Sequence, residues 1–392
     1  MAVDYVARSA ARTRRRETTD VATFVRRLDW ILLASVGFLV GYGLWAIAGI
    51  TRHDVTGNLH YYVVRQSVYV AVGFVGLLIA LVIDPDWYRR HWRLIFGGTV
   101  FVIAIVFAQG AVRGSKRWLD LGFFRFQPSE FGKVLFVVAL AGFLAERSRR
   151  LGEARTVVRA IGLASIPIFL VFVQPDVGTA MVYTAAFAAI LFVAGVRWWH
   201  LGILAAAAIF VVTFVLWTGP AAGIHILRPY QVDRLTGFFH PNSDPGGATY
   251  NIVQSKNAIG AGQLRGRGID GATQTTLHFL PEHHTDFVFA SLSEERGFVG
   301  ASILLGLYLL VVWRGLRIIA LARDQFSAIV AGGIVFALLF QIFVNAGMTM
   351  GIAPITGIPA PFLSVGGSSM IANLVGVGIL LAIHARARGQ RR

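Results

Sequence analysis

Two pairs of ionisable residues stand where long apolar stretches begin, and a charged side chain is costly there. Glu130 and Lys133 open one stretch, and Asp286 and Glu294 lie at the start of another. Because Glu130 and Lys133 are three residues apart, they share a helix face and can form an ion pair. An acid in the first turn after Pro128 also suits the helix dipole, but this does not account for the deeper lysine. The pair is therefore expected to serve a cavity, through chemistry or through structure.

Asp286 is the second-to-last residue of the run FLPEHHTDF (279–287), at the start of the eighth apolar stretch. Ala290, Ser293 and Gly297 follow it at helical spacing, which predicts a small, polar face that a ligand or another helix can approach closely. Glu294 lies within reach of the same face. A carboxylate at this position is equally well explained as a helix cap, so the residue types alone leave both readings open.

The polar segment 113–128, RGSKRWLDLGFFRFQP, places Lys116 and Arg117 beside Trp118. Two cations next to an aromatic ring suit a phosphate and the face of a sugar. An aromatic residue anchored at a membrane interface explains Trp118 equally well. Taken together, the cations, carboxylates and aromatic residues describe one site for an anionic lipid that carries a sugar.

Signatures of several other function classes are absent from the sequence. It contains no P-loop, no GxGxxG motif after a strand and no HExxH motif, which argues against nucleotide-driven transport and zinc hydrolysis. Cysteine is absent, which excludes disulfides, thiol chemistry and cysteine metal sites. His283 and His284 are adjacent and cannot both face one metal ion on a regular element, so we interpret them as loop residues.

The elements that must position these residues are membrane helices. Of 392 residues, 56% are hydrophobic and 14% are charged, which is too apolar for a soluble chain of this size. About 20 apolar residues span a bilayer as a helix, and lipid offers no partner for an unpaired backbone group. Strands of a barrel would alternate apolar and polar residues. We expect an all-α polytopic membrane protein with about ten transmembrane helices, near 30–50, 67–83, 94–112, 131–145, 160–173, 177–196, 198–217, 287–312, 328–350 and 369–383.

The net charge of +16 arises from 36 Lys and Arg against 20 Asp and Glu. Such a balance can indicate nucleic-acid binding, but its distribution indicates membrane topology instead. With both termini placed in the cytoplasm, cytoplasmic segments hold 23 basic residues and short external loops hold six. This asymmetry is the positive-inside pattern, and it also favours anionic lipid. We therefore expect no nucleic-acid partner.

This topology divides the chain into a basic cytoplasmic arm (1–29), a transmembrane domain (30–386) and a basic cytoplasmic tail (387–392). A large extracellular loop, 218–285, joins helices seven and eight. Its glycine-rich part, 259–271, suits either close backbone approach to a ligand or a flexible loop.

Segment 351–369 contains three prolines and a Gly-Gly pair, so it cannot be a regular helix. Because it is apolar, we expect it to re-enter the membrane from outside.

Five motifs in this order resemble the SEDS family of shape, elongation, division and sporulation proteins. They are GSKRWLDLGFFRFQPSE (114–130), QPDVGT (174–179), YNIVQSKNAIGAGQLRGRG (250–268), FLPEHHTDFVFASLSEERG (279–297) and PITGIPAPFLSVGGSS (354–369). Three details resemble the elongation branch more than the division homologue: FLPE before HTDF, GATQ at 271–274, and NAGM before ITGIP. Ala360 and Val365 stand where the family has Leu and Tyr, which puts a role for that tyrosine hydroxyl in doubt. Arg296 stands where the family commonly has an apolar residue after the two acids.

The resemblance implies a peptidoglycan glycosyltransferase that polymerises lipid II, with a class B penicillin-binding protein and elongation-complex membrane proteins as partners. It implies a place in the bacterial plasma membrane with the active site facing outside. It also implies that Asp286 is the essential carboxylate, supported by Trp118, Glu130 and Lys133. Glu294, on the face of Asp286, is assigned with them to substrate binding.

The resulting hypothesis is an inverting glycosyl transfer in which Asp286 is the general base. Lys133, with Lys116 or Arg117, would stabilise the departing pyrophosphate. Glu130 would hold Lys133 in place or share a divalent cation, Mg or Mn, with the phosphates. The alternatives are a lipid II flippase, a non-catalytic scaffold for wall synthesis, and the role of the division homologue.

Overall fold

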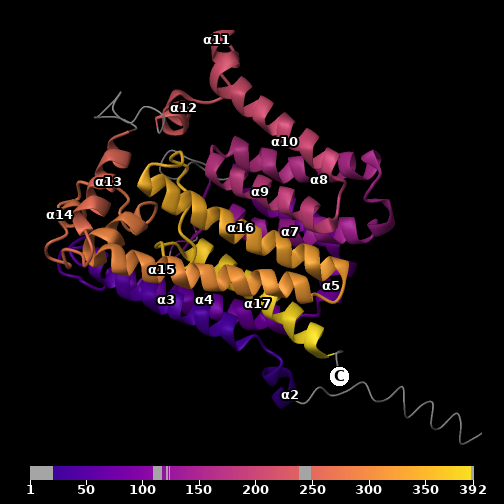
Figure 1. The fold of residues 1–392 in the computed structure, drawn as a ribbon, viewed down its shortest axis with the longest axis horizontal. Helices are drawn as coiled ribbons and strands as arrows, with labels where there is room; N and C mark the ends of the chain where they lie inside the picture. Colours follow the sequence, from indigo (N-terminus) through magenta and orange to yellow (C-terminus); the bar gives the residue numbers. More distant parts are fainter. Residues whose placement is uncertain (1–20, 109–116, 121, 123, 238–248, 390–392) are drawn as a thin grey trace, which may run out of the picture.

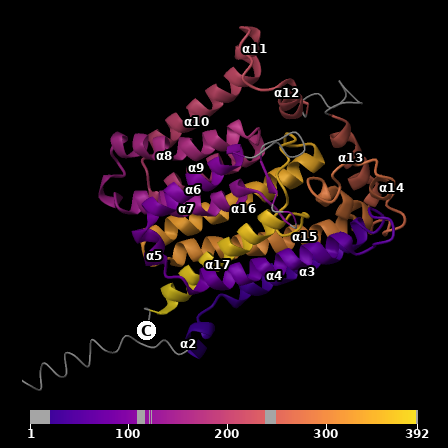
Figure 2. The same cartoon turned by 180° about the vertical axis from the view of Figure 1, so that it is seen from behind.

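The computed structural model describes residues 21–108, 117–120, 122, 124–237 and 249–389. Its long helices lie side by side in one bundle, with α13 and α14 at the end opposite to α2 and the C-terminus (Figures 1 and 2). The helices are α2 (Val21–Arg26), α3 (Trp30–Ile50), α4 (Tyr61–Val82), α5 (Pro85–Arg90), α6 (Trp92–Ala104), α7 (Pro128–Ala145), α8 (Ala154–Val173), α9 (Val177–Ala194), α10 (Trp198–Thr213), α11 (Gly219–Ala221), α12 (Pro229–Thr236), α13 (Tyr250–Gly262), α14 (Thr273–Thr276), α15 (Val288–Leu321), α16 (Gln325–Met350) and α17 (Gly367–Gly389). Three short helical segments of other types are η1 (Ile105–Ala108), η2 (Ser148–Arg150) and η3 (Phe214–Thr218).

Within these described residues, nine helices are long and apolar enough to cross a membrane, and a shorter apolar one spans Trp92–Ala108. Each of the ten apolar stretches predicted from the sequence falls on one of these helices, and the last residues of the third, 109–112, lie outside the described part. The prediction of an all-α, multi-pass membrane protein is confirmed at this level. Strands β1 (Leu119–Asp120) and β2 (Arg125–Phe126) form one minute antiparallel hairpin.

Helix α17 lies at the centre of the bundle and α10 lies at its edge. Of the apolar span in α17, 94% is buried, because it packs along α4 and also against α7, α15 and α16. The most apolar 18-residue window of the span that contains α10 has no buried residue, and both views show this helix leaning away from the bundle toward α11 (Figures 1 and 2). Helix α15 packs against α3, α13 and α16, so it joins the membrane bundle to the elements at the end that carries α13.

Local signals in the sequence set where several helices begin. The Asp29 carboxylate accepts a hydrogen bond from Leu32 N at 3.1 Å and caps α3, and Asp176 caps α9 by accepting from Thr179 N at 3.2 Å. Pro128 occupies the first turn of α7, where its missing N–H costs nothing. Pro128 and Asp176 thus define where α7 and α9 begin.

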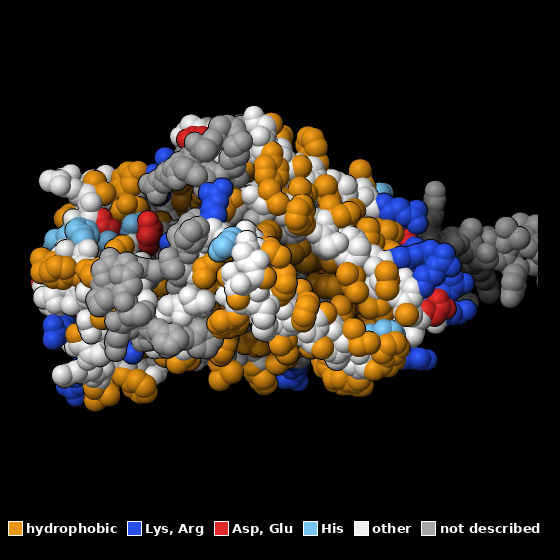
Figure 3. Space-filling view, turned by 90° about the horizontal axis from the view of Figure 1, so that it is seen from above, with side chains coloured by type: hydrophobic (Ala, Val, Ile, Leu, Met, Phe, Trp, Pro, Cys, Tyr) orange, Lys and Arg blue, Asp and Glu red, His pale blue; other side chains and the backbone are white. Residues whose placement is uncertain are grey.

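The two ends of the bundle differ in side-chain chemistry. Hydrophobic side chains cover the middle of the face in Figure 3, and Lys and Arg gather at the end near α2 and the C-terminus. Acidic and histidine side chains appear at the opposite end, which carries α13 and α14. The chemistry expected from the sequence belongs to that opposite end.

Candidate active site

The ion pair predicted at the start of α7 is present. The Lys133 Nζ lies 2.8 Å from Glu130 Oε2, and the side chains are only 7% and 3% exposed. The same ammonium donates a hydrogen bond to Gln341 Oε1 on α16 at 3.0 Å. Beside the pair, a small pocket of about 20 Å³ lies between α7, α16 and α17 and is lined by mainly apolar residues together with Lys133, Gln341 and Asn373. A buried cation therefore faces a small cavity inside the bundle.

Asp286 lies in the turn before α15 and is partly buried. Its backbone carbonyl accepts a hydrogen bond at 2.9 Å from Asn345 Nδ2, and the same amide donates to Ile358 O at 2.8 Å. Gly357 has a φ of +70°, and a Cβ there would lie 3.3 Å from Asp286 Oδ2. Glycine therefore allows the backbone of the segment before α17 to pass directly beside the carboxylate.

That segment is non-helical from residue 352 to 366, as its prolines predict. Its C-terminal part is fastened to the turn that carries Asp286. The Ser364 hydroxyl donates to Thr285 O at 2.6 Å, and Val365 N donates to His284 O at 3.0 Å. The turn is thus held on one side by α16 and on the other by this irregular segment.

Gln341 and Asn345 connect the two predicted groups. They are four residues apart on α16, so they lie one above the other on the same helix face. Gln341 binds the Lys133 ammonium, and Asn345 binds the backbone of Asp286. One face of α16 therefore contacts both the buried cation and the backbone of the residue that carries the carboxylate.

Burial raises the pKa of the Asp286 carboxyl from its ordinary value to about 6, and the negative charge of Glu282 adds to the rise. The Arg234 guanidinium lowers the pKa, and smaller contributions come from Asp176, which raises it, and Arg117, which lowers it. At neutral pH the carboxyl is mostly deprotonated but more basic than an exposed aspartate. This is the range in which a carboxylate serves best as a general base.

A small cleft of about 30 Å³ lies beside this turn and is lined by Arg117, Pro175, Asp176, Val177, Gln231, Arg234, Leu235, Ile355 and Thr356. Arg117 Nη1 lies 3.9 Å from Asp176 Oδ1, and Gln127 donates to Asp176 Oδ2 at 3.0 Å. Arg234 lies on α12 and lines the cleft. Its backbone carbonyl accepts a hydrogen bond from Ile355 N at 3.2 Å. Two guanidinium groups therefore stand at a cleft whose charges act on Asp286.

Sequence reasoning did not assign Asp176 or Arg234 to the site. Asp176 lies in the QPDVGT motif, which is a usable signal. Arg234 lies on a short amphipathic helix whose position relative to the cleft depends on the fold.

The remaining predicted residues are placed differently. Trp118 is half-buried directly before β1, and Lys116 lies outside the described residues. Glu294 is fully buried, and its carboxylate accepts hydrogen bonds from Gln274 N, Thr275 N and Thr275 Oγ1 at 2.9, 3.0 and 2.8 Å. In this conformation Glu294 anchors α14. Its assignment to substrate binding stays a prediction.

The glycine-rich segment approaches protein rather than a ligand. Helix α15 is opened at Gly297, which has a φ of +64°, and Phe298 N and Val299 N donate to Gln263 O and Leu264 O. In the other direction, Arg267 N donates to Glu294 O at 2.9 Å. A Cβ at Gly297 would overlap with the backbone of this segment. The close backbone approach expected from its glycines is therefore made to α15.

The two adjacent histidines lie against a carboxylate from a distant loop. They lie in a turn, as predicted, but a turn is not a regular element, and both imidazoles face the Asp54 carboxylate. The prediction that they are loop residues is confirmed, and the restriction on sharing one ion, which holds for regular backbone, does not apply to this turn.

Comparison with known proteins bears on the whole chain. The family model FTSW_RODA_SPOVE, described as "Cell cycle protein", matches residues 25–389. The chain is 39% identical over 325 residues to the peptidoglycan glycosyltransferase MrdB of Escherichia coli (strain K12), covering 83% of this chain and 86% of that protein.

Two solved structures have the same fold. One is a chain from a study of how a peptidoglycan synthase complex coordinates polymerization and crosslinking, with a TM-score of 0.78, 28% identity, and coverage of 93% of this chain and 99% of that one. The other is the rod shape determining protein RodA of Thermus thermophilus, with a TM-score of 0.67, 25% identity and coverage of 93% and 98%. The family predicted from the five motifs is confirmed, and the chain belongs to the FtsW, RodA and SpoVE family of cell cycle proteins, the SEDS family.

Proposed function

We propose that this chain is a peptidoglycan glycosyltransferase that polymerises lipid II into glycan strands at the outer face of the bacterial plasma membrane during cell elongation. Its family membership supports this activity, and the relative MrdB carries the name of the same activity. The likeness to RodA, a rod shape determining protein, favours the elongation role over the division role.

The observation that carries the proposal is the shared face of α16. Its residues Gln341 and Asn345, one helical turn apart, contact a buried ammonium and the backbone carbonyl of Asp286, whose carboxyl has a raised pKa. A transfer from a lipid pyrophosphate needs both groups, since a base must take a proton and a cation must stabilise the leaving group.

In the proposed reaction, the 4-hydroxyl of one lipid-linked disaccharide attacks the anomeric carbon of the growing chain. Asp286 takes the hydroxyl proton as the new carbon–oxygen bond forms. The bond from the anomeric carbon to the pyrophosphate breaks, and undecaprenyl pyrophosphate leaves with the electron pair. Lys133 and Arg117 stabilise the negative charge that develops on it, with Lys116 in the same role. Attack opposite to the leaving group inverts the anomeric centre.

Glu130 has one role in this scheme, which is to hold Lys133. Its Oε2 is in contact with the ammonium at 2.8 Å, so a divalent cation at the same oxygen would meet a positive charge. No step is therefore assigned to Mg or Mn at this position.

The proposed topology has ten transmembrane helices, both termini in the cytoplasm and the loop 218–285 outside. It places the arm 1–29 and the tail 387–392 on the cytoplasmic side of the domain 30–386. The partner is a class B penicillin-binding protein, and other elongation-complex membrane proteins join them. The likeness to a chain from a peptidoglycan synthase complex supports such a partner.

The test is conversion of labelled lipid II in detergent micelles by the purified chain with its partner. Micelles have no leaflets, so polymer formed there arises from glycosyl transfer and not from transport across a membrane. A glycan ladder on a gel is expected. No polymer under any condition, together with lipid II movement across vesicle membranes, would favour a flippase. Normal growth of cells that carry a charge-neutral change at Asp286 would favour a scaffold.

A further inference from the structure

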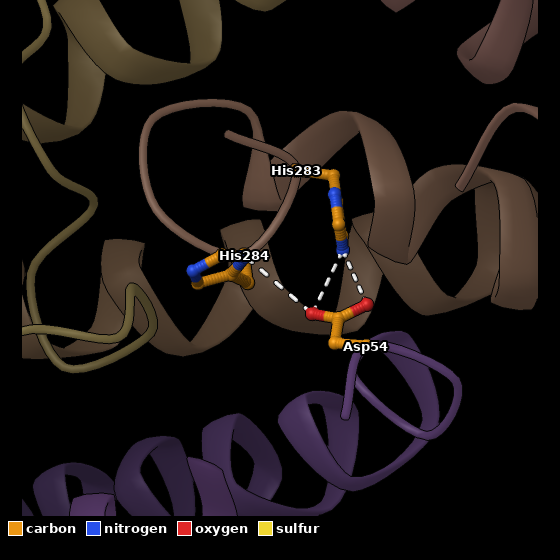
Figure 4. Close-up of side chains that lie close together, drawn as sticks. All are labelled: Asp54, His283 and His284. Atoms are coloured by element: carbon orange, nitrogen blue, oxygen red, sulfur yellow. Dashed lines mark hydrogen bonds and ion pairs between the residues drawn. The ribbon is translucent and has the colours of Figure 1, made fainter. Parts of the chain in front are cut away.

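A cluster of nitrogen and oxygen donors lies beside the turn that carries Asp286 but takes no part in the proposed transfer. It consists of Asp54, from the loop between α3 and α4, with His283 and His284 (Figure 4). His283 Nε2 lies 3.0 and 3.1 Å from the two oxygens of Asp54. His284 Nδ1 lies 3.6 Å from Asp54 Oδ2. The one ligand atom that each residue offers lies within 4.8 Å of the others.

These separations match the edges of a metal coordination sphere. A tetrahedral ion with ligands at about 2.0–2.1 Å separates neighbouring ligand atoms by about 3.3–3.4 Å. The measured contacts to Asp54, 3.0 to 3.6 Å, bracket this edge length. The three ligand atoms lie within 4.8 Å of one another, so the wider edge would close by up to about 1.4 Å for all three to hold one ion.

Burial distinguishes this cluster from an exposed group of polar residues. The side chains of Asp54 and His283 are only 7% and 6% exposed, and that of His284 is 19% exposed. His278, at 53% exposed, brings its Nδ1 to 4.0 Å from Asp54 Oδ1 at the rim. Solvent therefore has limited access to the cluster, and water or His278 would complete the coordination.

We propose that Asp54, His283 and His284 form a binding site for a divalent transition metal, with zinc as the ion that their donor set fits. Two imidazoles and one carboxylate are a ligand set found at zinc, with water in the fourth position. Magnesium and calcium prefer sites made of oxygen donors alone.

The site has a structural consequence for Asp286. Asp54 follows α3, whereas His284 is two residues before Asp286. A bound ion would fasten the α3–α4 loop to the turn that holds the carboxylate, in addition to the contacts from α16 and the irregular segment. This consequence rests on the proposed function, but metal binding itself does not.

The experiment uses tag-free full-length protein in detergent, because a histidine tag binds zinc. After removal of metal by a chelator, zinc is titrated by calorimetry without lipid II, so failure of the proposed glycosyl transfer leaves the outcome unaffected. One equivalent of zinc should bind, and the melting temperature should rise with zinc concentration, since an ion that binds only the folded state stabilises it.

Asp54→Asn and His283→Gln are the test variants, because both retain hydrogen-bonding groups of similar reach. Each should weaken zinc binding by at least about 100-fold, the upper range for loss of a group that merely supports a ligand. His53→Gln is the matched control, since His53 lies in the same loop but is exposed and faces Asp270. Its zinc binding should equal that of the unchanged protein.

Zinc binding that is equal in all three variants would overturn the proposal. If either test variant fails to fold, cobalt added to the unchanged protein decides. Visible absorption bands of tetrahedral intensity are expected from Co²⁺ in this donor set, and zinc should displace them. Absence of both the bands and stoichiometric zinc binding would reduce the cluster to a hydrogen-bonded contact between two loops.

Discussion

Removing the charge of Lys133 tests how the buried ion pair works. Lys133→Met keeps most of the side-chain length but leaves the Glu130 carboxylate, 3% exposed, without the cation now 2.8 Å away. Breaking a buried pair from one side costs about 3–5 kcal/mol, because the remaining charge is uncompensated. Glu130→Gln should cost less, since Gln341 still accepts from the ammonium at 3.0 Å. The double variant removes both charges and should regain most of the lost stability.

Activity should follow a different order from stability. If Lys133 stabilises the departing pyrophosphate, both Lys133→Met and the double variant lack that cation. A missing electrostatic group of this kind typically costs about 10²- to 10³-fold in rate. We therefore expect the double variant to fold and insert normally but to make at least about 100-fold less polymer than the unchanged protein.

The assay combines thermal unfolding in detergent with gel-resolved glycan from labelled lipid II, measured on the same preparations. Lys256→Met is the matched control, because Lys256 is exposed on α13 and lies in no ion pair among the described residues. It should change neither stability nor rate. Near-normal polymer from the double variant would refute a role for Lys133 in transfer and leave the pair a structural one.

Three other perturbations test separate parts of the site. The polymerisation rate should fall in proportion to the deprotonated fraction of Asp286 as the pH drops through about 6, its raised pKa; a profile that stays flat well below this pH would exclude this base. Asn345→Leu removes the donor to two backbone carbonyls, so polymer yield should fall at least about tenfold and stability by about 1–3 kcal/mol, measured by gel and by melting. Arg314→Met should lower the free energy of unfolding by about 3–5 kcal/mol, since Arg314 Nη2 lies 2.6 Å from the buried Asp29 carboxylate. The polymerisation rate per folded molecule should stay unchanged, and a lower rate would contradict the placement of Arg314 outside the site.

The membrane helices and the first ion pair could be predicted because their signals are local. Each apolar stretch must satisfy its own backbone in lipid, so length and hydropathy locate it without knowledge of its neighbours. The pairing of Glu130 with Lys133 follows in the same way from three residues of helical spacing. The prolines of segment 351–369 likewise exclude helix through their own geometry.

The rest of the site depends on contacts between distant segments. Asn345 reaches the backbone of Asp286 across 59 positions, and His283 reaches Asp54 across 229. No spacing rule connects such residues, and although the histidine pair was predicted to lie in a loop, nothing in the sequence indicated that Asp54 would lie beside it. The glycine-rich segment was ambiguous for a related reason: composition shows that backbone can come close, but not to what.

Asp286→Asn tests the central claim most directly, because it preserves shape and removes only the ability to take a proton. A positioned general base contributes about 10²- to 10⁴-fold, so polymer from labelled lipid II should fall by at least about two orders of magnitude while folding and partner co-purification stay normal. Asp286→Glu should recover little, since a displacement of about 1 Å costs on the order of 10²-fold. Asp270→Asn, at a carboxylate that is 85% exposed, is the control and should polymerise normally. Near-native polymer from Asp286→Asn would contradict the assignment of this carboxylate as the base.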